Sequence, residues 1–297
     1  MKLAALDLGS NSFHLLVAEV DTAGELMKVG SAKQVLRLGT EVQERGQLGD
    51  AAFRQALQAV AQLANYSREL GATTLIAVAT SAIRDARNGS AFCSACREQL
   101  GVQVELLSGN EEAQLAYSGA RSAINTRARR VLVADVGGGS VELAAGVDSW
   151  CDTVASLPLG FLRLSHAFPV SEPAGAQRLA RYVQLEVEKA RSQLGRFDTL
   201  LLSGGTARAV GKLLGGGVAS ASAPQVLKLC TRLGELEPAE LQGLGVDKAR
   251  SKTLAAGAAV VAGILAGLNQ RELRISPRGL REGLLLRELS RRATRAA

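Results

Sequence analysis

The chain of 297 residues is 47% hydrophobic and 21% charged, which excludes a disordered chain and suits two globular domains. It has no apolar run long enough to span a membrane and no apolar stretch typical of a signal peptide at its start, so we expect a cytoplasmic protein without a membrane partner. The net charge of +7 favours polyanionic partners, whereas an aromatic content of 3% leaves few rings to stack on bases, so nucleic acid is not expected as a partner.

The chain begins with the pattern of two strands joined by a polar turn. Residues 3–8 are apolar apart from Asp7, and residues 13–18 are mostly apolar again. Glycine and short polar residues between two such strands allow backbone N–H groups to converge on an anion. We therefore predict a phosphate-binding turn made by Gly9, Ser10, Asn11 and Ser12.

Residues 27–38 are predicted to form a further strand of the same sheet. Lys33 and Arg37 could face a bound phosphate as ligands, or they could be edge-strand charges that discourage aggregation. A helix capped by Asp50 is then expected to run to about residue 70, followed by a short strand over residues 74–79.

This short strand leads through Thr80 and Ser81 into a predicted helix. Hydroxyls and N–H donors at such a place bind anions well, which makes Arg84, one turn into the helix, a candidate phosphate ligand. The alternative is that Arg84 is a solvated helix charge. Cys93 and Cys96 are expected to be reduced thiols on a helix, because no second cysteine pair completes a zinc site.

A helix beginning near Ser108 carries two adjacent glutamates, Glu111 and Glu112, after a short strand over residues 104–107. Acidic residues in a first turn stabilise the helix dipole, which is a sufficient structural reason for both. The functional alternative is that one of them activates a water molecule.

Residues 131–143 repeat the N-terminal pattern of strand, turn and strand. Asp135 stands at the end of the first strand, where a cation could bridge it to phosphate, and Glu142 lies close behind it on the returning strand. An ordinary glycine-rich hairpin is the alternative. The predicted phosphate ligands of this turn are Gly137, Gly138, Gly139 and Ser140.

Asp7 and Asp135 lie 128 residues apart, a period that fits two similar α/β domains. Each domain would offer one turn to a shared cleft, which is a common place for a ligand. We place the domains at residues 1–126 and 127–297, with a basic linker over residues 126–130.

The second domain is expected to contain a third phosphate-compatible turn. A predicted strand over residues 199–203 runs into Gly205 and Thr206, which open a helix. The other elements expected in this half are strands near residues 153–157 and 273–275 and helices over residues 172–194, 223–231, 238–244, 250–268 and 280–294.

Six stretches of the chain, taken together, resemble the exopolyphosphatase and guanosine pentaphosphate phosphatase family, within the actin and sugar-kinase fold superfamily. The resemblance implies an α/β fold in which two actin-like (ribonuclease H-like) domains flank an interdomain cleft. It also implies that the turns bind phosphate together with Arg84, that Glu112 is the catalytic base, and that Asp135 and Glu142 hold Mg²⁺ or Mn²⁺. The matching stretches are residues 7–14, 79–88, 108–113, 135–142, 204–206 and 280–283.

The activity that fits both the turns and the resemblance is hydrolysis of the terminal phosphoanhydride of inorganic polyphosphate, with release of orthophosphate. Guanosine pentaphosphate is the alternative substrate, because it presents the same terminal anhydride. A kinase of the same superfamily and a non-catalytic polyphosphate or nucleotide sensor are the alternatives from other functional classes. The chain stops near residue 297 and so resembles a short two-domain member without the additional C-terminal helical domains of long members. Homodimer formation stays open.

Overall fold

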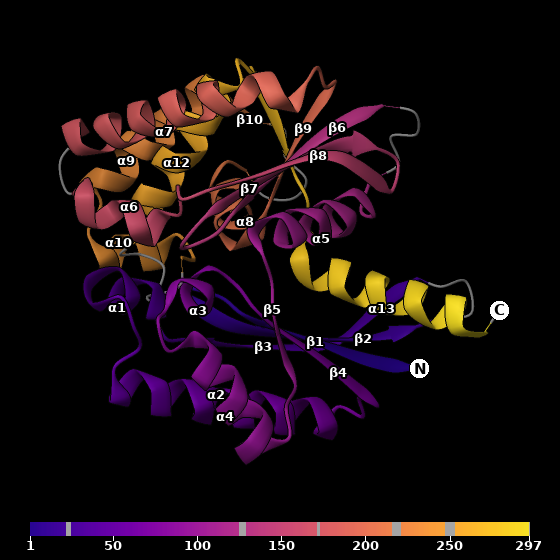
Figure 1. Ribbon diagram of the computed structural model, residues 1–297. Coiled ribbons are helices and arrows are strands. Elements are labelled where there is room, and N and C mark those ends of the chain that lie inside the picture. The colour runs from indigo at the N-terminus through magenta and orange to yellow at the C-terminus, as the bar shows by residue number, and fades with distance from the viewer. Residues whose placement is uncertain (22–24, 125–128, 171–172, 216–220, 247–252, 297) are drawn as a thin grey trace.

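Two β-sheets with helices on both faces organise the chain, one sheet above the other in Figure 1. The computed structural model describes residues 1–21, 25–124, 129–170, 173–215, 221–246 and 253–296. No helix in these described ranges is long and apolar enough to cross a membrane.

The first sheet has the strand order β3-β2-β1-β4-β5, in which β1 pairs antiparallel with β2 and parallel with β4. Side chains of β1 alternate between its two faces: Leu6 and Leu8 join the core beneath α2 and α4, whereas Leu3 packs with residues of α13. The elements are β1 (Lys2–Leu8), β2 (Ser12–Val20), β3 (Leu26–Val35), α2 (Asp50–Glu69), β4 (Thr74–Ala79), α4 (Gly89–Leu100), β5 (Val104–Leu106) and α13 (Leu280–Ala296).

The second sheet has the order β10-β11-β9-β6-β7-β8. Apart from β10, this order repeats that of the first sheet, with β6 and β7 forming the antiparallel hairpin that β1 and β2 form there. The repeat predicted from the two aspartates is therefore confirmed as a repeat of topology. The elements are β6 (Arg130–Val136), β7 (Val141–Val147), β8 (Trp150–Leu157), α7 (Pro173–Leu194), β9 (Thr199–Ser203), α8 (Gly204–Leu213), β10 (Ala221–Ser222), α9 (Ala223–Glu235), α10 (Pro238–Gly243), α12 (Leu254–Gly267) and β11 (Glu272–Ile275).

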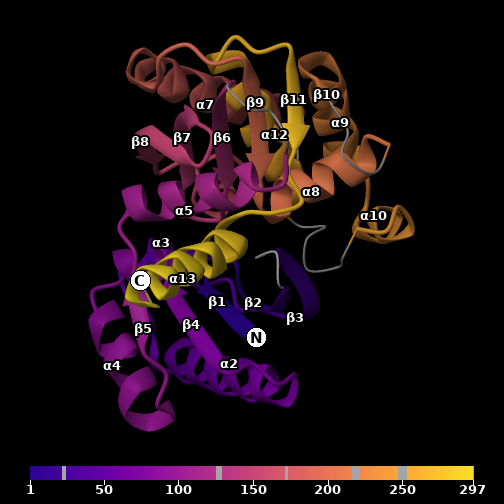
Figure 2. The same ribbon diagram turned by 90° about the vertical axis from the view of Figure 1, so that its right-hand side faces the viewer.

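The two halves exchange one helix each. Helix α5 (Gly109–Arg121) follows the last strand of the first sheet but packs on the second, whereas α13 follows the second sheet and packs on the first (Figure 2). The helices cross at glycines: a Cβ on Gly119 would lie 1.9 Å from the carbonyl oxygen of Gly279, and one on Gly283 would lie 1.9 Å from that of Leu115. Only glycine permits this approach, so the crossing joins the two halves tightly.

Three short helices lie where the two halves meet: α1 (Leu38–Arg45), α3 (Ser81–Asp85) and α6 (Phe161–Ala167). The expected strand over residues 27–38 is wrong at its end, because β3 stops at Val35 and α1 starts at Leu38. The chain turns at Arg37, which adopts a left-handed conformation (φ 55°) while its N–H donates to the carbonyl of Asn11. Helices α1 and α6 were not expected from the sequence.

Several other expectations can be compared with the described residues. Helix α2 starts at Asp50, but Gly49 occupies the N-cap position. The cysteine pair lies on α4 as free thiols. Most of the predicted linker over residues 126–130, and the predicted helix starts at residues 172 and 250, lie outside the described residues.

Candidate active site

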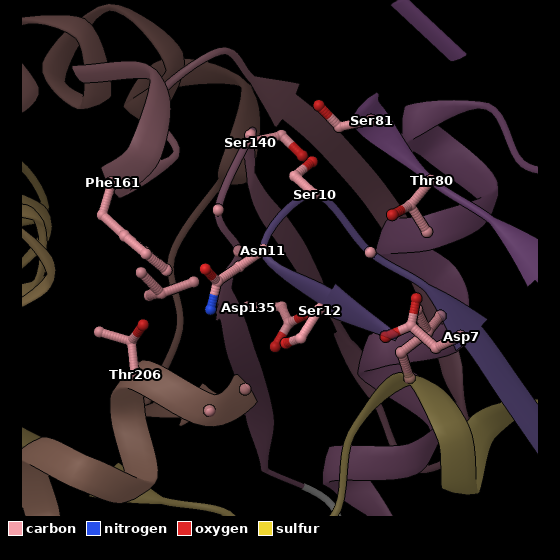
Figure 3. A pocket seen from close by; sticks show the side chains of 18 of the residues that line it. Asp7, Ser10, Asn11, Ser12, Thr80, Ser81, Asp135, Ser140, Phe161 and Thr206 are labelled. Carbon is pink, nitrogen blue, oxygen red and sulfur yellow. The ribbon is translucent and has the colours of Figure 1, made fainter. Parts of the chain in front are cut away.

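A cavity of about 120 Å³ lies between the two sheets, at the ends of β1 and β6. Both sheets contribute to its wall, so side chains far apart in the sequence surround one space (Figure 3). Most of its lining is polar: glycines, hydroxyl groups and the carboxylates of Asp7, Glu112 and Asp135. A cavity of this size and lining suits a small polar group such as a phosphoryl group rather than an apolar ligand.

The two hairpin turns at this cavity are held by the same kind of backbone hydrogen bond. In the first half, the N–H groups of Leu36 and Arg37 donate to the carbonyl of Asn11, at 3.1 and 2.9 Å. In the second half, Phe161 and Leu162 at the start of α6 donate to the carbonyls of Gly137 and Gly138, at 3.3 and 2.9 Å. Each turn therefore has carbonyl oxygens bound by the segment that follows the third strand of its sheet, rather than left to repel an anion.

The turns also touch each other across the cleft. A Cβ on Gly138 would lie 3.3 Å from the backbone nitrogen of Asn11, and one on Gly139 would lie 2.6 Å from the hydroxyl of Ser10. Larger residues at these positions would force the two halves apart, which gives a reason for consecutive glycines in the second turn.

Asp135 and Glu142 face each other on paired strands. They are register partners in the antiparallel pair β6 and β7, so their side chains share one face of the sheet. Asp135 Oδ1 accepts a hydrogen bond from Ser203 Oγ at 2.6 Å, and Glu142 Oε1 accepts one from Ser156 Oγ at 3.0 Å. Gly204 follows Ser203 with φ 92°, and a Cβ there would lie 2.8 Å from Asp135 Oδ1, so the start of α8 is shaped around this carboxylate.

The adjacent glutamates of α5 have different surroundings. Glu111 belongs to a capping box: its carboxylate accepts from the N–H of Ser108 at 2.8 Å, while the Ser108 hydroxyl accepts from the N–H of Glu111. Glu112 is 6% exposed and lines the cavity. Arg84 Nη1 donates to Glu112 Oε2 at 3.1 Å and to the carbonyl of Leu107 at 2.8 Å.

Burial raises the pKa values of the acidic groups around this cavity. It raises the pKa of Asp7 to about 7, although the charge of Arg281 opposes the change. It raises the pKa of Glu142 to about 8, although a hydrogen bond from Ser140 opposes it. The pKa of Glu112 lies well above its ordinary value because of burial and the nearby charge of Glu142, with Arg84 opposing both. So many buried carboxylates require protons or a cation to balance them.

The donor set fits a divalent cation. Asp7 Oδ1 and Glu142 Oε2 are buried and have no hydrogen-bond partner among the described residues. Mg²⁺ prefers oxygen ligands and is usually held by one or two carboxylates together with substrate phosphates. Within the described part of the chain, no group of three or more His, Cys, Asp and Glu side chains could hold a metal. A cation here would therefore need oxygen ligands from phosphate and water as well.

Most of the residues predicted from the sequence meet at this cavity. Arg84 and Glu142 are not part of its lining, but Arg84 contacts Glu112 and Glu142 is paired with Asp135. Arg37 does not line the cavity either, and its backbone supports the first turn. The predicted residues in the lining are Gly9, Ser10, Asn11, Ser12, Glu112, Asp135, Gly137, Gly138, Gly139, Ser140, Gly205 and Thr206.

Three residues at the site were given no role from the sequence. Asp7 was predicted only as part of the repeat, although its equivalence to Asp135 could have indicated that it lies at the site as well. Ser203 and Ser156 hold the carboxylates, and no motif in the sequence marks them, because their contacts depend on the pairing of β9 and β8 with their neighbours.

Known proteins resemble this chain in sequence and in fold. The Ppx/GppA phosphatase family matches residues 16–292 of the chain. Exopolyphosphatase 1 of Mycobacterium tuberculosis is 32% identical over 311 aligned residues, which cover 99% of this chain and 90% of that protein. The crystal structure of the Aquifex aeolicus member of the Ppx/GppA family has a TM-score of 0.82 at 26% identity and covers 98% of both chains. An exopolyphosphatase from Cytophaga hutchinsonii shares the fold, with a TM-score of 0.86 at 22% identity over 98% of both chains.

Proposed function

Because the chain belongs to the Ppx/GppA phosphatase family, we propose that it is an exopolyphosphatase. It hydrolyses the terminal phosphoanhydride of inorganic polyphosphate and releases orthophosphate. The observation that carries the proposal is the polar cavity between the two turns, whose lining includes Glu112 and Asp135.

The two turns bind the terminal phosphoryl group. Their backbone N–H groups and the hydroxyls of Ser10, Ser140 and Thr206 are donors around the cavity. Donors fixed in place before the reaction stabilise charge that develops on the transferred group without reorganisation, which is the main source of catalysis in phosphoryl transfer. Arg84 adds a positive charge beside Glu112.

Glu112 orients the attacking water and takes its proton. Its raised pKa makes it a stronger base than an exposed glutamate, and the hydrogen bond from Arg84 fixes one carboxylate oxygen while the other stays available. Glu111 is unsuited to this role, because its carboxylate caps α5.

Asp135 and Glu142 would hold Mg²⁺ or Mn²⁺, with Asp7 beside them. When bound, such a cation neutralises charge on the phosphate oxygens and balances the buried carboxylates. Ser203 and Ser156 keep the two carboxylates oriented for this purpose.

The choice of polyphosphate over guanosine pentaphosphate follows the name of the mycobacterial relatives. The net charge of +7 suits a long polyanion. The cytoplasmic location, the absence of nucleic-acid partners and homodimer formation stay predictions.

Phosphate release from polyphosphate, measured with Mg²⁺ and with ATP and guanosine pentaphosphate in parallel, tests the proposal. We expect polyphosphate to give the highest kcat/KM. Faster release from guanosine pentaphosphate would reverse the choice of substrate, and tight polyphosphate binding without release would support a sensor instead.

A further inference from the structure

Arg163, on α6 of the second half, connects three parts of the molecule through one guanidinium group. Its Nε donates to the carbonyl of Gly139 at 2.9 Å, in the triple-glycine turn. Its Nη1 donates to Gln43 Oε1 of α1 at 3.1 Å, and its Nη2 donates to Asp85 Oδ2 of α3. Two of its three partners therefore belong to the opposite half of the chain.

This guanidinium lies behind the phosphate-binding turns rather than in the reaction cavity. It lines a separate cavity of about 230 Å³ on the other side of Gly138 and Gly139, and it is absent from the lining of the cavity that contains Glu112. Arg163 therefore does not touch the reaction cavity itself and can act on it only through the residues that it contacts, which makes it a candidate positioning residue.

Its partners link that turn to the phosphate-binding arginine. Asp85 is the residue after Arg84 on α3, and Arg84 holds Glu112. In Figure 1 the helices α1, α3 and α6 lie at the left of the molecule, whereas α5 and the start of α13 meet near its middle. The arginine therefore joins the two halves through contacts other than those of the glycine crossing.

We propose that Arg163 is a latch: it holds the two halves closed through Asp85 and Gln43, and with the same guanidinium group it fixes the carbonyl of Gly139. Closure and the shape of the phosphate-binding turn are thereby coupled. The kinetic part of this proposal rests on the proposed function, whereas the structural part does not.

The side chains of Arg163 and Asp85 are 28% and 37% exposed, so their ion pair is partly screened by solvent. Loss of such a pair corresponds to a change of about two- to fivefold in a binding equilibrium. Asp85→Asn removes the ion pair but keeps the bond to Gly139. It should raise the KM for polyphosphate about two- to fivefold and leave kcat unchanged.

Arg163→Met removes the side-chain contacts with Asp85 and Gln43 and also the bond to Gly139. It should raise KM similarly and also lower kcat about two- to tenfold, because one hydrogen bond to the turn is lost. Arg163→Lys keeps a charge beside Asp85 without the forked donors, so its kcat should fall while its KM stays near the starting value. The matched control is Arg130→Met, whose ion pair with Asp152 lies within the second half. It should change neither constant.

The double variant with Arg163→Met and Asp85→Asn should behave like Arg163→Met alone, because each change breaks the same Arg163–Asp85 ion pair. The latch would be overturned if the fold-changes in KM of the two single variants multiplied in the double variant. It would also be overturned if KM and kcat of Arg163→Met equalled those of Arg130→Met. A lowered melting temperature with unchanged kinetic constants would overturn it too, since that result describes a purely structural ion pair.

Hydrogen–deuterium exchange of the substrate-free protein separates the latch from the proposed function. Peptides that contain Gly137 to Ser140 should exchange about two- to tenfold faster in Arg163→Met than in Arg130→Met. If this difference is seen but no polyphosphate is hydrolysed, the proposed function fails and the latch stands. Equal exchange in the two variants would refute the coupling, whatever the substrate.

Discussion

Replacement of Glu112 by glutamine should remove turnover while substrate affinity is retained. The amide has the shape of the carboxylate and still offers an oxygen to Arg84 Nη1, which lies 3.1 Å from the present carboxylate. It cannot accept a proton from water. The loss of a positioned general base corresponds to a decrease of about 100- to 10,000-fold in kcat.

That decrease equals about 3–5 kcal/mol of transition-state stabilisation. The fold should change far less. Glu112 is buried and close to the charge of Glu142, so glutamine removes a repulsion at the same time as it weakens the pair with Arg84. These effects oppose each other, and a change in unfolding free energy of about 1 kcal/mol or less is expected.

Glu111→Gln is the matched control, one residue away on the same helix. Its carboxylate caps α5, and Glu111 does not line the cavity, so this variant should lower the melting temperature slightly and leave kcat within about threefold of the original. Steady-state phosphate release and calorimetric titration of polyphosphate into each variant measure kcat and affinity. If Glu111→Gln loses turnover and Glu112→Gln keeps it, the base is misassigned; if both keep it, α5 supplies no base.

Buried carboxylates and closely packed glycines both affect the stability of the fold. In the presence of a chelator, the free energy of unfolding should fall as pH rises from about 5 to about 8. The reason is that the folded state keeps protons on Asp7 and Glu142, whose pKa values are about 7 and about 8, whereas the unfolded chain has already released them. Thermal melts with and without Mg²⁺ measure this effect, and bound Mg²⁺ should restore the melting temperature at high pH. Gly119→Ala should destabilise the protein by about 1–3 kcal/mol or more, since its Cβ would meet the carbonyl of Gly279, whereas Gly243→Ala, with open space around its Cβ, should not lower the melting temperature.

Much of the fold could be predicted because its main signals are local. An apolar strand, an aspartate and a glycine turn are contiguous in the sequence, and their repetition around Asp7 and Asp135 predicted the two similar sheets. The residues of both turns were expected at the cavity for the same reason, whereas Glu112 was singled out by the family resemblance.

What was missed depends on contacts between distant segments. Helices α1 and α6 have no side-chain N-cap, since Arg37 and Gly160 occupy those positions, and their first turns are set by bonds to the glycine turns. The exchange of α5 and α13 between the sheets is likewise a matter of tertiary packing. No local pattern reports it, although Gly119 and Gly283 mark the crossing.

The two adjacent glutamates of α5 show how a local pattern can separate neighbouring side chains. Successive residues on a helix point about 100° apart, so the side chains of Glu111 and Glu112 leave α5 in different directions. Ser108 and Glu111 have the Ser-x-x-Glu spacing of a capping box, which engages Glu111 with the start of the helix. The cap fixes where α5 begins and thereby the direction of the following side chain. That side chain is Glu112, which is buried beside Arg84. The Ser-x-x-Glu spacing is present in the sequence, but the residues alone left both glutamates open, and Glu112 was expected to be the base only because of the family resemblance.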